Sequence, residues 1–177
     1  DIDGTLTING AGTYDADGTF DATDGTVQFT GSGGTLKLGG ATVTSIGSSF
    51  VHGTGTVEYD YAGNQSVKAR NYYNLEIDGS NTSDVKSVVN SFTIDNNLTV
   101  SSNSAFDVLA RTITVTGASD INGILNINGS GILDANGVFD ATSGSITMDG
   151  TARLQLNSTV TSLGTLDANA GTVEYDQ

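Results

Sequence analysis

The sequence predicts an all-β protein, and among all-β architectures it favours a parallel β-solenoid (β-helix) of short strands. Three observations predict this fold: a long internal repeat, short segments of alternating apolar and polar residues, and glycine-containing turns between them. Antiparallel β-sandwich repeats are the alternative, because Asn-Gly turns are also typical of hairpins. The strands span only three to five residues and Trp is absent, which favours the solenoid over an immunoglobulin-like sandwich.

The repeat connects the two ends of the chain. Residues 1–25, DIDGTLTINGAGTYDADGTFDATDG, return at residues 120–144 as DINGILNINGSGILDANGVFDATSG. The hexapeptide GTVEYD likewise occurs at residues 55–60 and 171–176. Self-similarity over such a distance is the signature of a repeat architecture, here with a unit of about 119 residues.

Residues 61–119 occur once, so the chain holds about one and a half units. We predict that residues 1–60 are the second half of one unit, 61–119 the first half of the next, and 120–177 its second half. All three parts are expected to form one continuous elongated domain. At about 20 residues per coil and about 4.8 Å between coils, such a solenoid would have about nine coils and a length of about 43 Å.

Short segments with alternating apolar and polar residues recur along the whole chain. A period of two is that of a β-strand with one buried face. These segments are residues 6–8, 27–29, 36–38, 57–59, 75–77, 98–100, 113–115, 125–127, 146–148 and 154–156. Asn-Gly and Asp-Gly pairs between them supply the positive φ that tight corners need. The side chains expected to point inward include Leu6, Ile8, Phe29, Leu38, Leu125, Ile127 and Leu156.

One stretch has a helical alternative. Val85, Val88, Val89 and Phe92 lie at helical spacing behind Ser83, a residue type that caps helix N-termini. The β-branched valines lose side-chain freedom in a helix, which favours strand here too.

Composition and charge exclude several classes of function. The 177 residues include 20 acidic and 6 basic side chains, for a net charge of −14, which would repel nucleic acid. Cysteine is absent, so disulfide scaffolds, thiol catalysis and Cys-ligated zinc are excluded. No apolar run approaches the ~18 residues of a transmembrane helix, so we expect no membrane insertion.

A family resemblance rests on an ordered series of segments. Residues 52–79 read HGTGTVEYDYAGNQSVKARNYYNLEIDG, and residues 90–108 read NSFTIDNNLTVSSNSAFDV. This series resembles the repeats of very large secreted surface proteins of gliding and related Bacteroidetes, including the gliding-motility adhesins. The resemblance implies a repetitive cell-surface filament, exported by type IX secretion and often adhesive, and hence an extracellular location. It transfers no catalytic or ligand-binding residue.

The sequence offers little catalytic chemistry. His52 is the only histidine, and the second copy of the repeat has Ala168 at its place, so a His-based triad or zinc site would exist in one copy only. An exposed loop histidine is the favoured interpretation. Carboxylate pairs such as Glu58 and Asp60 could serve glycoside hydrolysis, yet the arginines have no repeated carboxylate partner. These arginines are Arg70, Arg111 and Arg153. We therefore predict that the chain is not an enzyme.

Four Asp-x-[Asp/Asn]-Gly corners are candidate calcium sites, because calcium prefers closely spaced carboxylate and amide oxygens. Their candidate ligands are Asp1, Asp3, Asp15, Asp17, Asp120, Asn122, Asp134 and Asn136. No glutamate closes these loops as in an EF-hand. Capping of their own turns by these side chains is the favoured interpretation, so no cofactor is expected.

Two binding functions remain as alternatives to a structural role. Thr-x-Thr pairs could order ice-like water if they stacked on one side, but their irregular intervals favour ordinary β-propensity. These pairs are Thr5/Thr7, Thr42/Thr44, Thr112/Thr114/Thr116 and Thr159/Thr161. Tyr61, Tyr72 and Tyr73 could form an exposed cluster for sugars, whereas alternation places Tyr59 and Tyr175 in the core.

The sequence thus predicts a non-enzymatic structural or adhesive repeat of a long extracellular surface filament, with a glycan- or ice-binding solenoid module as the alternative. The expected partners are neighbouring repeats of the same chain and surface polysaccharide.

Overall fold

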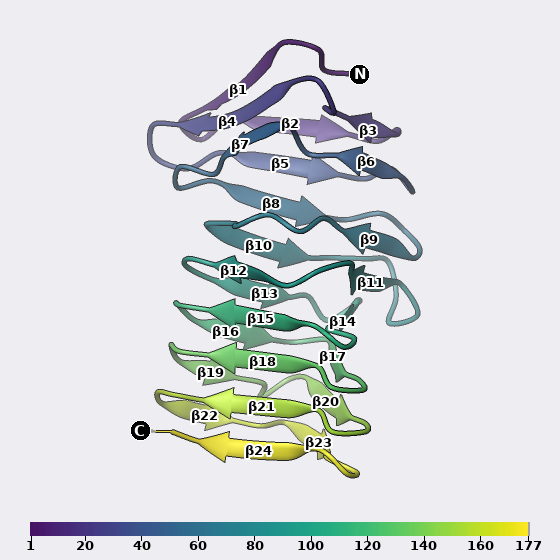
Figure 1. Ribbon diagram of the computed structural model, residues 1–177, viewed down its shortest axis with the longest axis vertical. Helices are drawn as coiled ribbons and strands as arrows, with labels where there is room; N and C mark the ends of the chain where they lie inside the picture. The colour runs from purple at the N-terminus through teal and green to yellow at the C-terminus, as the bar shows by residue number, and fades with distance from the viewer. Residues whose placement is uncertain (177) are drawn as a thin grey trace.

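The chain forms an all-β rod. The computed structural model describes residues 1–176, which contain 24 β-strands and no helix. The strands pair in parallel and stack into a β-solenoid (Figure 1). The predicted solenoid is therefore confirmed, and the antiparallel sandwich is not formed. The helical alternative is wrong as well, because its residues form β11 (Val85–Val88) and the start of β12 (Phe92–Ile94).

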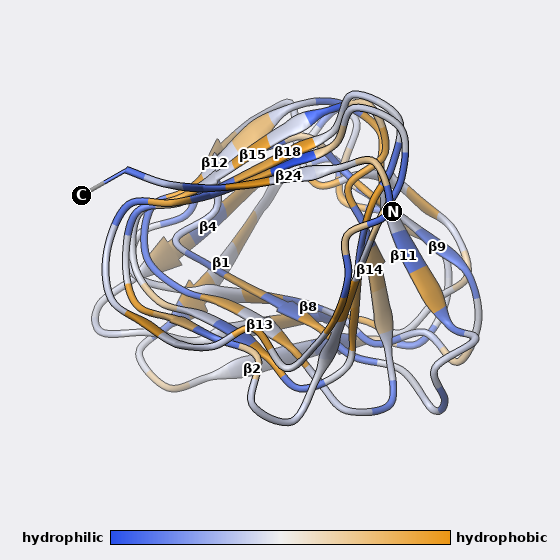
Figure 2. Ribbon diagram, turned by 90° about the horizontal axis from the view of Figure 1, so that it is seen from below, coloured by the Kyte–Doolittle hydropathy of each residue, from blue (hydrophilic) through white to orange (hydrophobic). Residues whose placement is uncertain are grey.

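The rod has three sides that enclose an apolar interior (Figure 2). Side 1 is one eight-stranded sheet of β2 (Thr13–Ala16), β5 (Thr35–Leu38), β8 (Thr56–Tyr59), β10 (Asn74–Ile77), β13 (Leu98–Val100), β16 (Ser119–Ile121), β19 (Phe139–Asp140) and β22 (Val160–Ser162). Side 2 consists of β3 (Phe20–Asp21) and β6 (Val43–Ser45), followed by β9 (Gln65–Val67), β11, β14 (Ala105–Asp107), β17 (Ile124–Ile127), β20 (Ser145–Met148) and β23 (Thr165–Asp167). Side 3 consists of β1 (Thr5–Asn9), β4 (Thr26–Thr30) and β7 (Ser49–Val51), followed by β12, β15 (Thr112–Val115), β18 (Ile132–Ala135), β21 (Arg153–Leu156) and β24 (Thr172–Tyr175).

The chain visits the sides in a constant order, from side 3 to side 1 to side 2. Side 1 has a strand in each of eight coils, slightly fewer than the nine expected. Coil length varies, because Thr56 pairs with Asn74, 18 residues further on, and Leu75 pairs with Leu98, 23 residues further on. In the short coil a single bridge from Tyr72 to Ile94 replaces the strand of side 3.

The interior is one hydrophobic cluster that runs along the whole rod. Six of the seven side chains expected to point inward are buried, and the seventh, Leu6, is partly buried against the cluster. An aromatic column crosses the short coil, with Phe29, Phe50, Tyr72 and Phe92 in successive edge contacts at 6.2, 5.9 and 5.2 Å between ring centroids. This packing joins the two separately paired parts of side 3.

Glycine at the corners allows the coils to approach closely. A Cβ atom on Gly40 would lie 1.9 Å from the backbone oxygen of Gly18, and one on Gly131 would lie 1.9 Å from that of Leu109. Any side chain at these corners would have to push adjacent coils apart, which explains why corners carry glycine.

The two copies of the repeat occupy different sides of the rod. Strands β1 to β8 carry the sequence that returns, in the same order, on β17 to β24. Yet β2, β5 and β8 lie on side 1, whereas the corresponding β18, β21 and β24 lie on side 3. Likewise β1 lies on side 3 and its counterpart β17 on side 2. The second copy is therefore rotated by one side relative to the first.

Candidate functional site

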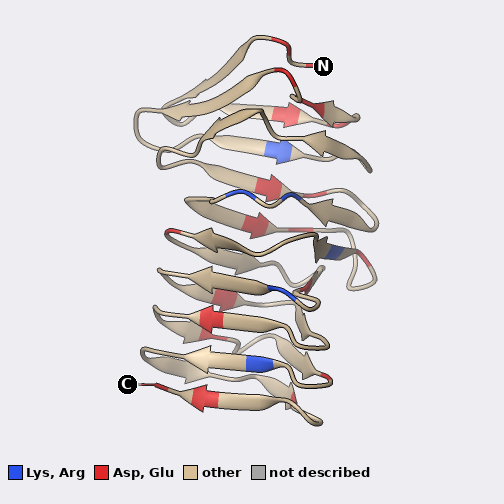
Figure 3. Cartoon of the chain, in the orientation of Figure 1, with Lys and Arg blue, Asp and Glu red and all other residues tan. Residues whose placement is uncertain are grey.

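Outward side chains on side 1 form a charged row along the rod. In-register pairing places Asp15 of β2, Lys37 of β5 and Glu58 of β8 one above another, and Glu76 of β10 continues the row (Figure 3). We call Asp15, Lys37 and Glu58 the first ladder. The Nζ atom of Lys37 lies 2.6 Å from Oε1 of Glu58 and 3.8 Å from Oδ2 of Asp60. Lys37 thus links the carboxylate of Glu58, in this row, to that of Asp60, which follows β8.

Burial dominates the electrostatics of the first ladder. Glu58 is only 6% exposed, and burial raises its pKa although Lys37 opposes the shift. Burial also raises the pKa of Asp60 and of Glu76, and neighbouring carboxylates raise both further. The hydrogen bond from Lys37 to Glu58 raises the pKa of the lysine. The first ladder is therefore a place where negative charge is held at a cost to the folded state.

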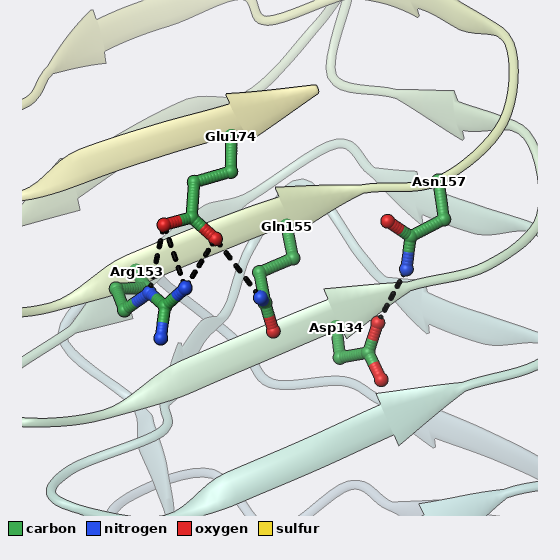
Figure 4. Close-up of polar contacts among 5 residues, drawn as sticks. All are labelled: Asp134, Arg153, Gln155, Asn157 and Glu174. Carbon is green, nitrogen blue, oxygen red and sulfur yellow. Dashed lines mark hydrogen bonds and ion pairs between the residues drawn. The ribbon is translucent and has the colours of Figure 1, made fainter. Parts of the chain in front are cut away.

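A second row of the same design lies on side 3. Register places Asp134 of β18, Gln155 of β21 and Glu174 of β24 one above another, and we call these three residues the second ladder. Figure 4 shows Arg153 beside this ladder, donating through Nε and Nη2 to Oε1 of Glu174 at 3.0 and 2.6 Å. The Nε2 atom of Gln155 donates to the other carboxylate oxygen at 2.9 Å. Hydrogen bonds from Arg153 and Gln155 lower the pKa of Glu174.

At the other end of the second ladder, amide and hydroxyl side chains donate hydrogen bonds to the carboxylate of Asp134. The Nδ2 atom of Asn157 donates to Oδ1 of Asp134 at 2.8 Å (Figure 4). The same atom donates to Oδ1 of Asn136 at 2.9 Å. The hydroxyl of Thr114, one coil earlier, donates to Asp134 at 3.3 Å. Cross-coil bonds therefore connect three successive coils on this surface.

The two ladders are equivalent positions of the internal repeat. The strands β2, β5 and β8 correspond to β18, β21 and β24, and the ladder residues hold the same place in each strand. Four of the predicted calcium ligands lie in or beside the ladders: Asp15, Asp17, Asp134 and Asn136. The sequence pattern found these acidic corners but not their alignment across coils.

The other four predicted ligands lie outside the two ladders, although Asp120 continues the row of the first ladder along side 1. Asp120 and Asn122 are on side 1, where Nδ2 of Asn122 donates to the Asp120 carboxylate at 3.0 Å, and Asp1 and Asp3 precede β1. In residues 1–176 no three or more His, Cys, Asp or Glu side chains are arranged to hold a metal ion. The calcium hypothesis stays a prediction.

Carboxylate capping of a local turn occurs at a repeated position that the sequence analysis did not single out. Asp21 accepts hydrogen bonds from the backbone N–H of Thr23 at 2.9 Å and from its hydroxyl at 2.6 Å. Asp140 accepts the same two bonds from Thr142, at 2.8 and 2.6 Å. In both copies these hydrogen bonds lower the pKa of the aspartate. The shared FDAT sequence was the available signal.

His52 is half-buried at the corner between side 3 and side 1. Its ring stacks on Tyr73 with centroids 6.2 Å apart, and Nε2 lies 3.1 Å from Oδ2 of Asp95. The second copy has Ala168 at this place, so this arrangement is present once in the chain.

The tyrosines differ from the predicted cluster. Tyr72 is fully buried, so its expected exposure is wrong, and Tyr61 and Tyr73 are half-buried. Tyr59 is buried as expected, and burial raises its pKa to about 12. Its hydroxyl lies 3.0 Å from that of Tyr72 and accepts the backbone N–H of Lys68 at 2.9 Å. The hydroxyl of Tyr72 donates to the carbonyl of Lys68. The two tyrosines thus bind both backbone polar groups of Lys68, in the coil where side 3 lacks a strand.

Tyr175 is 60% exposed, against the prediction that it is buried. It pairs with Leu156 in register, but β24 has a neighbouring strand on one edge only. Tyr175 therefore points to the same side of the sheet as the buried Leu156, as predicted, but no strand on the other edge of β24 covers its ring.

Two polar side chains point into the rod at the corner between sides 1 and 2. Gln65 donates to two carbonyls of the preceding coil at 2.7 and 2.8 Å. Lys86 is fully buried and donates to the carbonyls of Tyr61 and Gly63 at 2.6 and 2.9 Å. Burial lowers the pKa of Lys86. Period-two alternation with the inward Val88 was the signal that could have identified this lysine as interior.

The remaining two arginines also bind backbone carbonyls of the preceding coil. Arg70 donates to Gly47 at 2.7 Å and Arg111 donates to Val89 at 3.0 Å. Basic side chains in this rod therefore serve mainly to join coils.

Comparisons with known proteins identify no relative: no family model, no curated protein and no solved structure matches the chain significantly. The resemblance to adhesin repeats of Bacteroidetes stays an expectation from sequence. Residues 1–176 include no helix of the length and apolarity needed to cross a membrane.

Proposed function

We propose that the chain is a non-enzymatic structural segment of a long extracellular surface filament, which extends or presents adhesive surface away from the cell. The observation that carries this proposal is the stacking of both repeat copies on one uninterrupted apolar core. A coil that pairs only with its two neighbours can be added many times without a change of topology. Repetition in sequence therefore becomes length in space.

The surface depressions support a role without catalysis. Four of them have volumes from about 150 to about 340 Å³, and none of the four is lined by aspartate, glutamate or histidine. The largest lies on side 2 where β6 and β9 are not paired, and its lining includes Asn64, Ser66 and Ser87. Lys68 and Arg70 line one depression and Tyr14 lines another, whereas general acid–base chemistry most often uses histidine or a carboxylate.

A glycan-binding module is the second candidate, and the second ladder favours it. Its outward carboxylate, amide and guanidinium groups are the donors and acceptors that sugar hydroxyls require. Ice binding has less support, because the threonine pairs are spread over the rod. Thr5 and Thr7 lie on side 3, Thr44 on side 2 and Thr161 on side 1.

The structural proposal is tested by lengthening the chain. Residues 61–176 are appended after Asp176, which the repeat makes equivalent to Asp60. The path from β8 to β24 covers five coils and two further sides, so the added part should lengthen the rod by about 27 Å at about 4.8 Å per coil. We expect small-angle scattering to give this increase, with one melting transition no lower than that of the parent chain.

A control chain carries the same appended residues behind a flexible Gly/Ser linker, which separates the two cores. It should show a broader distribution of maximum dimensions than the direct fusion. Equal scattering profiles for the two chains, or two separate melting transitions in the direct fusion, would contradict the structural proposal.

A further inference from the structure

The internal repeat and the solenoid coil have different periods. From β2 to β16 the chain makes five complete coils along side 1, and two further sides bring it to β18, the counterpart of β2. The same path of five coils and two sides separates β8 from β24. The repeat therefore spans five and two-thirds coils instead of a whole number.

We infer that successive repeats present each equivalent surface a third of a turn apart around the rod. This inference rests on the proposed function, in which such repeats follow one another in a filament. The first ladder faces outward from side 1 and the second ladder from side 3. By the same step, the ladder of a following repeat faces outward from side 2, and the fourth returns to side 1.

The core tolerates this rotation because the three sides are interchangeable for a short strand. Leu36 beside the first ladder and Leu154 beside the second are both fully buried, although they lie on different sides. Alternation preserves which side chains point inward, whatever side a strand occupies. The repeat must span a whole number of sides, and it need not span a whole number of coils.

This rotation determines which kind of partner can engage the filament. A flat partner, such as an ice face, touches one side of a rod and would meet the equivalent ladder in only one repeat of three. A partner that surrounds the rod meets every ladder, and binding at several linked sites adds avidity. The arrangement therefore fits a hydrated polysaccharide matrix, which is the surface polysaccharide expected from the sequence.

Spin-label distances test the rotation in the chain itself, which has no native cysteine. The control variant is Asp15→Cys with Asp120→Cys, because these residues lie in one row of side 1, five coils apart. Its labels should be about 24 Å apart along the rod. The test variant is Asp15→Cys with Asp134→Cys, with an axial component of about 27 Å and a further separation across the core of at least about 10 Å.

These components give a test distance of at least about 29 Å, about 5 Å longer than the control distance, and we expect both variants to melt as the parent does. A test distance equal to the control distance within the width of the measured distributions would overturn the inference. If the test variant melts differently from the parent, it is replaced by Thr13→Cys with Ile132→Cys, whose residues lie on the same two strands. The distance between its labels is judged by the same criterion.

The lengthened chain separates this inference from the proposed function. Labels at Asp134 and at its appended counterpart should again be offset across the rod. If the rod lengthens by the expected amount but these labels lie in one row, the rotation is wrong and the structural role stands. If the rod does not lengthen, the structural role fails, while the distances in the parent chain still decide the rotation.

The partner is tested with the parent chain and two probes, ice and a hydrated neutral polysaccharide gel such as agarose. Retention by the gel that falls at least threefold in Gln155→Ala supports the matrix. Ice shaping by the parent chain, or equal retention of the variant, contradicts it.

Discussion

The two ladders occupy equivalent positions of the repeat and have opposite electrostatics. In the first ladder burial raises the pKa of Glu58, whereas in the second ladder hydrogen bonds from Arg153 and Gln155 lower the pKa of Glu174. The strands of the two ladders pair in the same register, with Val57 beside Leu36 and Val173 beside Leu154. Equivalent sequence positions therefore do not imply equivalent charge behaviour.

Two structural differences explain the contrast. Strand β8 is paired on both edges, with β5 and β10, so Glu58 is covered, whereas β24 is paired with β21 alone. The central residue also differs, because Lys37 supplies a charge where Gln155 supplies a neutral amide. The repeat determines where a side chain points, and the neighbouring coils determine its ionisation.

The largest expected effect concerns what the ladders share. Leu36→Ala and Leu154→Ala each remove a fully buried side chain next to a ladder, and each should lower the free energy of unfolding by about 2–5 kcal/mol. Chemical denaturation followed by circular dichroism measures both losses. Clearly unequal losses would show that the core does not pack equivalently beside the two ladders, and the comparison of the ladders would lose its basis.

A smaller effect should separate the basic residues of the two ladders. Lys37→Met leaves the buried Glu58 carboxylate without its donor, which should cost about 1–3 kcal/mol at pH 7. Arg153→Met exposes Glu174 to solvent that can replace the lost bonds, so its melting temperature should fall less. Thermal melts of both variants at pH 7 test this order. A greater loss for Arg153→Met would contradict the assigned difference in burial.

Much of this architecture could be predicted from sequence, and the reasons are local. Strict alternation in segments such as residues 125–127 identifies inward side chains, and glycine identifies corners. The rotation of the second copy could not be predicted, because it depends on counting sides through the irregular coil around Tyr72. Because a coil of 18 residues is followed by one of 23, the number of sides cannot be counted from a regular spacing in the sequence.

The polar interior and the ladders were missed for a related reason. The sequence did not identify Lys86 as interior, because lysine is almost never fully buried unless it is paired, yet two corner carbonyls of the preceding coil accept hydrogen bonds from its ammonium group. The ladders need cross-coil register, which sets Lys37 against Glu58, 21 residues away. Such a separation carries no local signal.

The pH dependence of two further variants should have opposite signs. Burial raises the pKa of Glu76 in the folded protein, so its charge destabilises the fold above that pKa, and this cost disappears as the pH falls through it. Glu76→Gln should therefore stabilise the rod at pH 7 by less than about 1 kcal/mol, since solvent still screens this half-buried group. The gain should vanish at acidic pH, where the native glutamate is protonated.

Glu174→Gln is the matched variant on the second ladder. Hydrogen bonds lower the pKa of Glu174, so its charge stabilises the fold above the ordinary glutamate pKa, and this contribution is lost as the pH falls through the folded-state value. The substitution should lower the melting temperature at pH 7 and have less effect at acidic pH. Melting curves between pH 7 and pH 3 measure both variants, and shifts of the same sign would refute the electrostatic contrast.

The smallest expected effect is that of calcium, and it bears on both ladders at once. In the first ladder the ammonium group of Lys37 already lies against Glu58 and near Asp60, where a cation would have to bind. In the second ladder the Nδ2 donor of Asn157 lies between the oxygens of Asp134 and Asn136. A bound metal ion would have to displace these donors, and calcium would gain few ligands in return.

If calcium bound only the folded state, it would raise the free energy of unfolding by about 2.7 kcal/mol at a free calcium concentration 100 times the dissociation constant. We expect instead that millimolar calcium shifts the melting temperature no more than magnesium does at matched ionic strength, because both ions only screen the net charge of −14. A calcium-selective increase that is lost in Asp15→Asn would assign an ion to the first ladder, and one lost in Asp134→Asn would assign it to the second. Either result would mean that the cross-coil donors yield to a cation, so that the rod is stiffened by calcium on the side where that ladder lies.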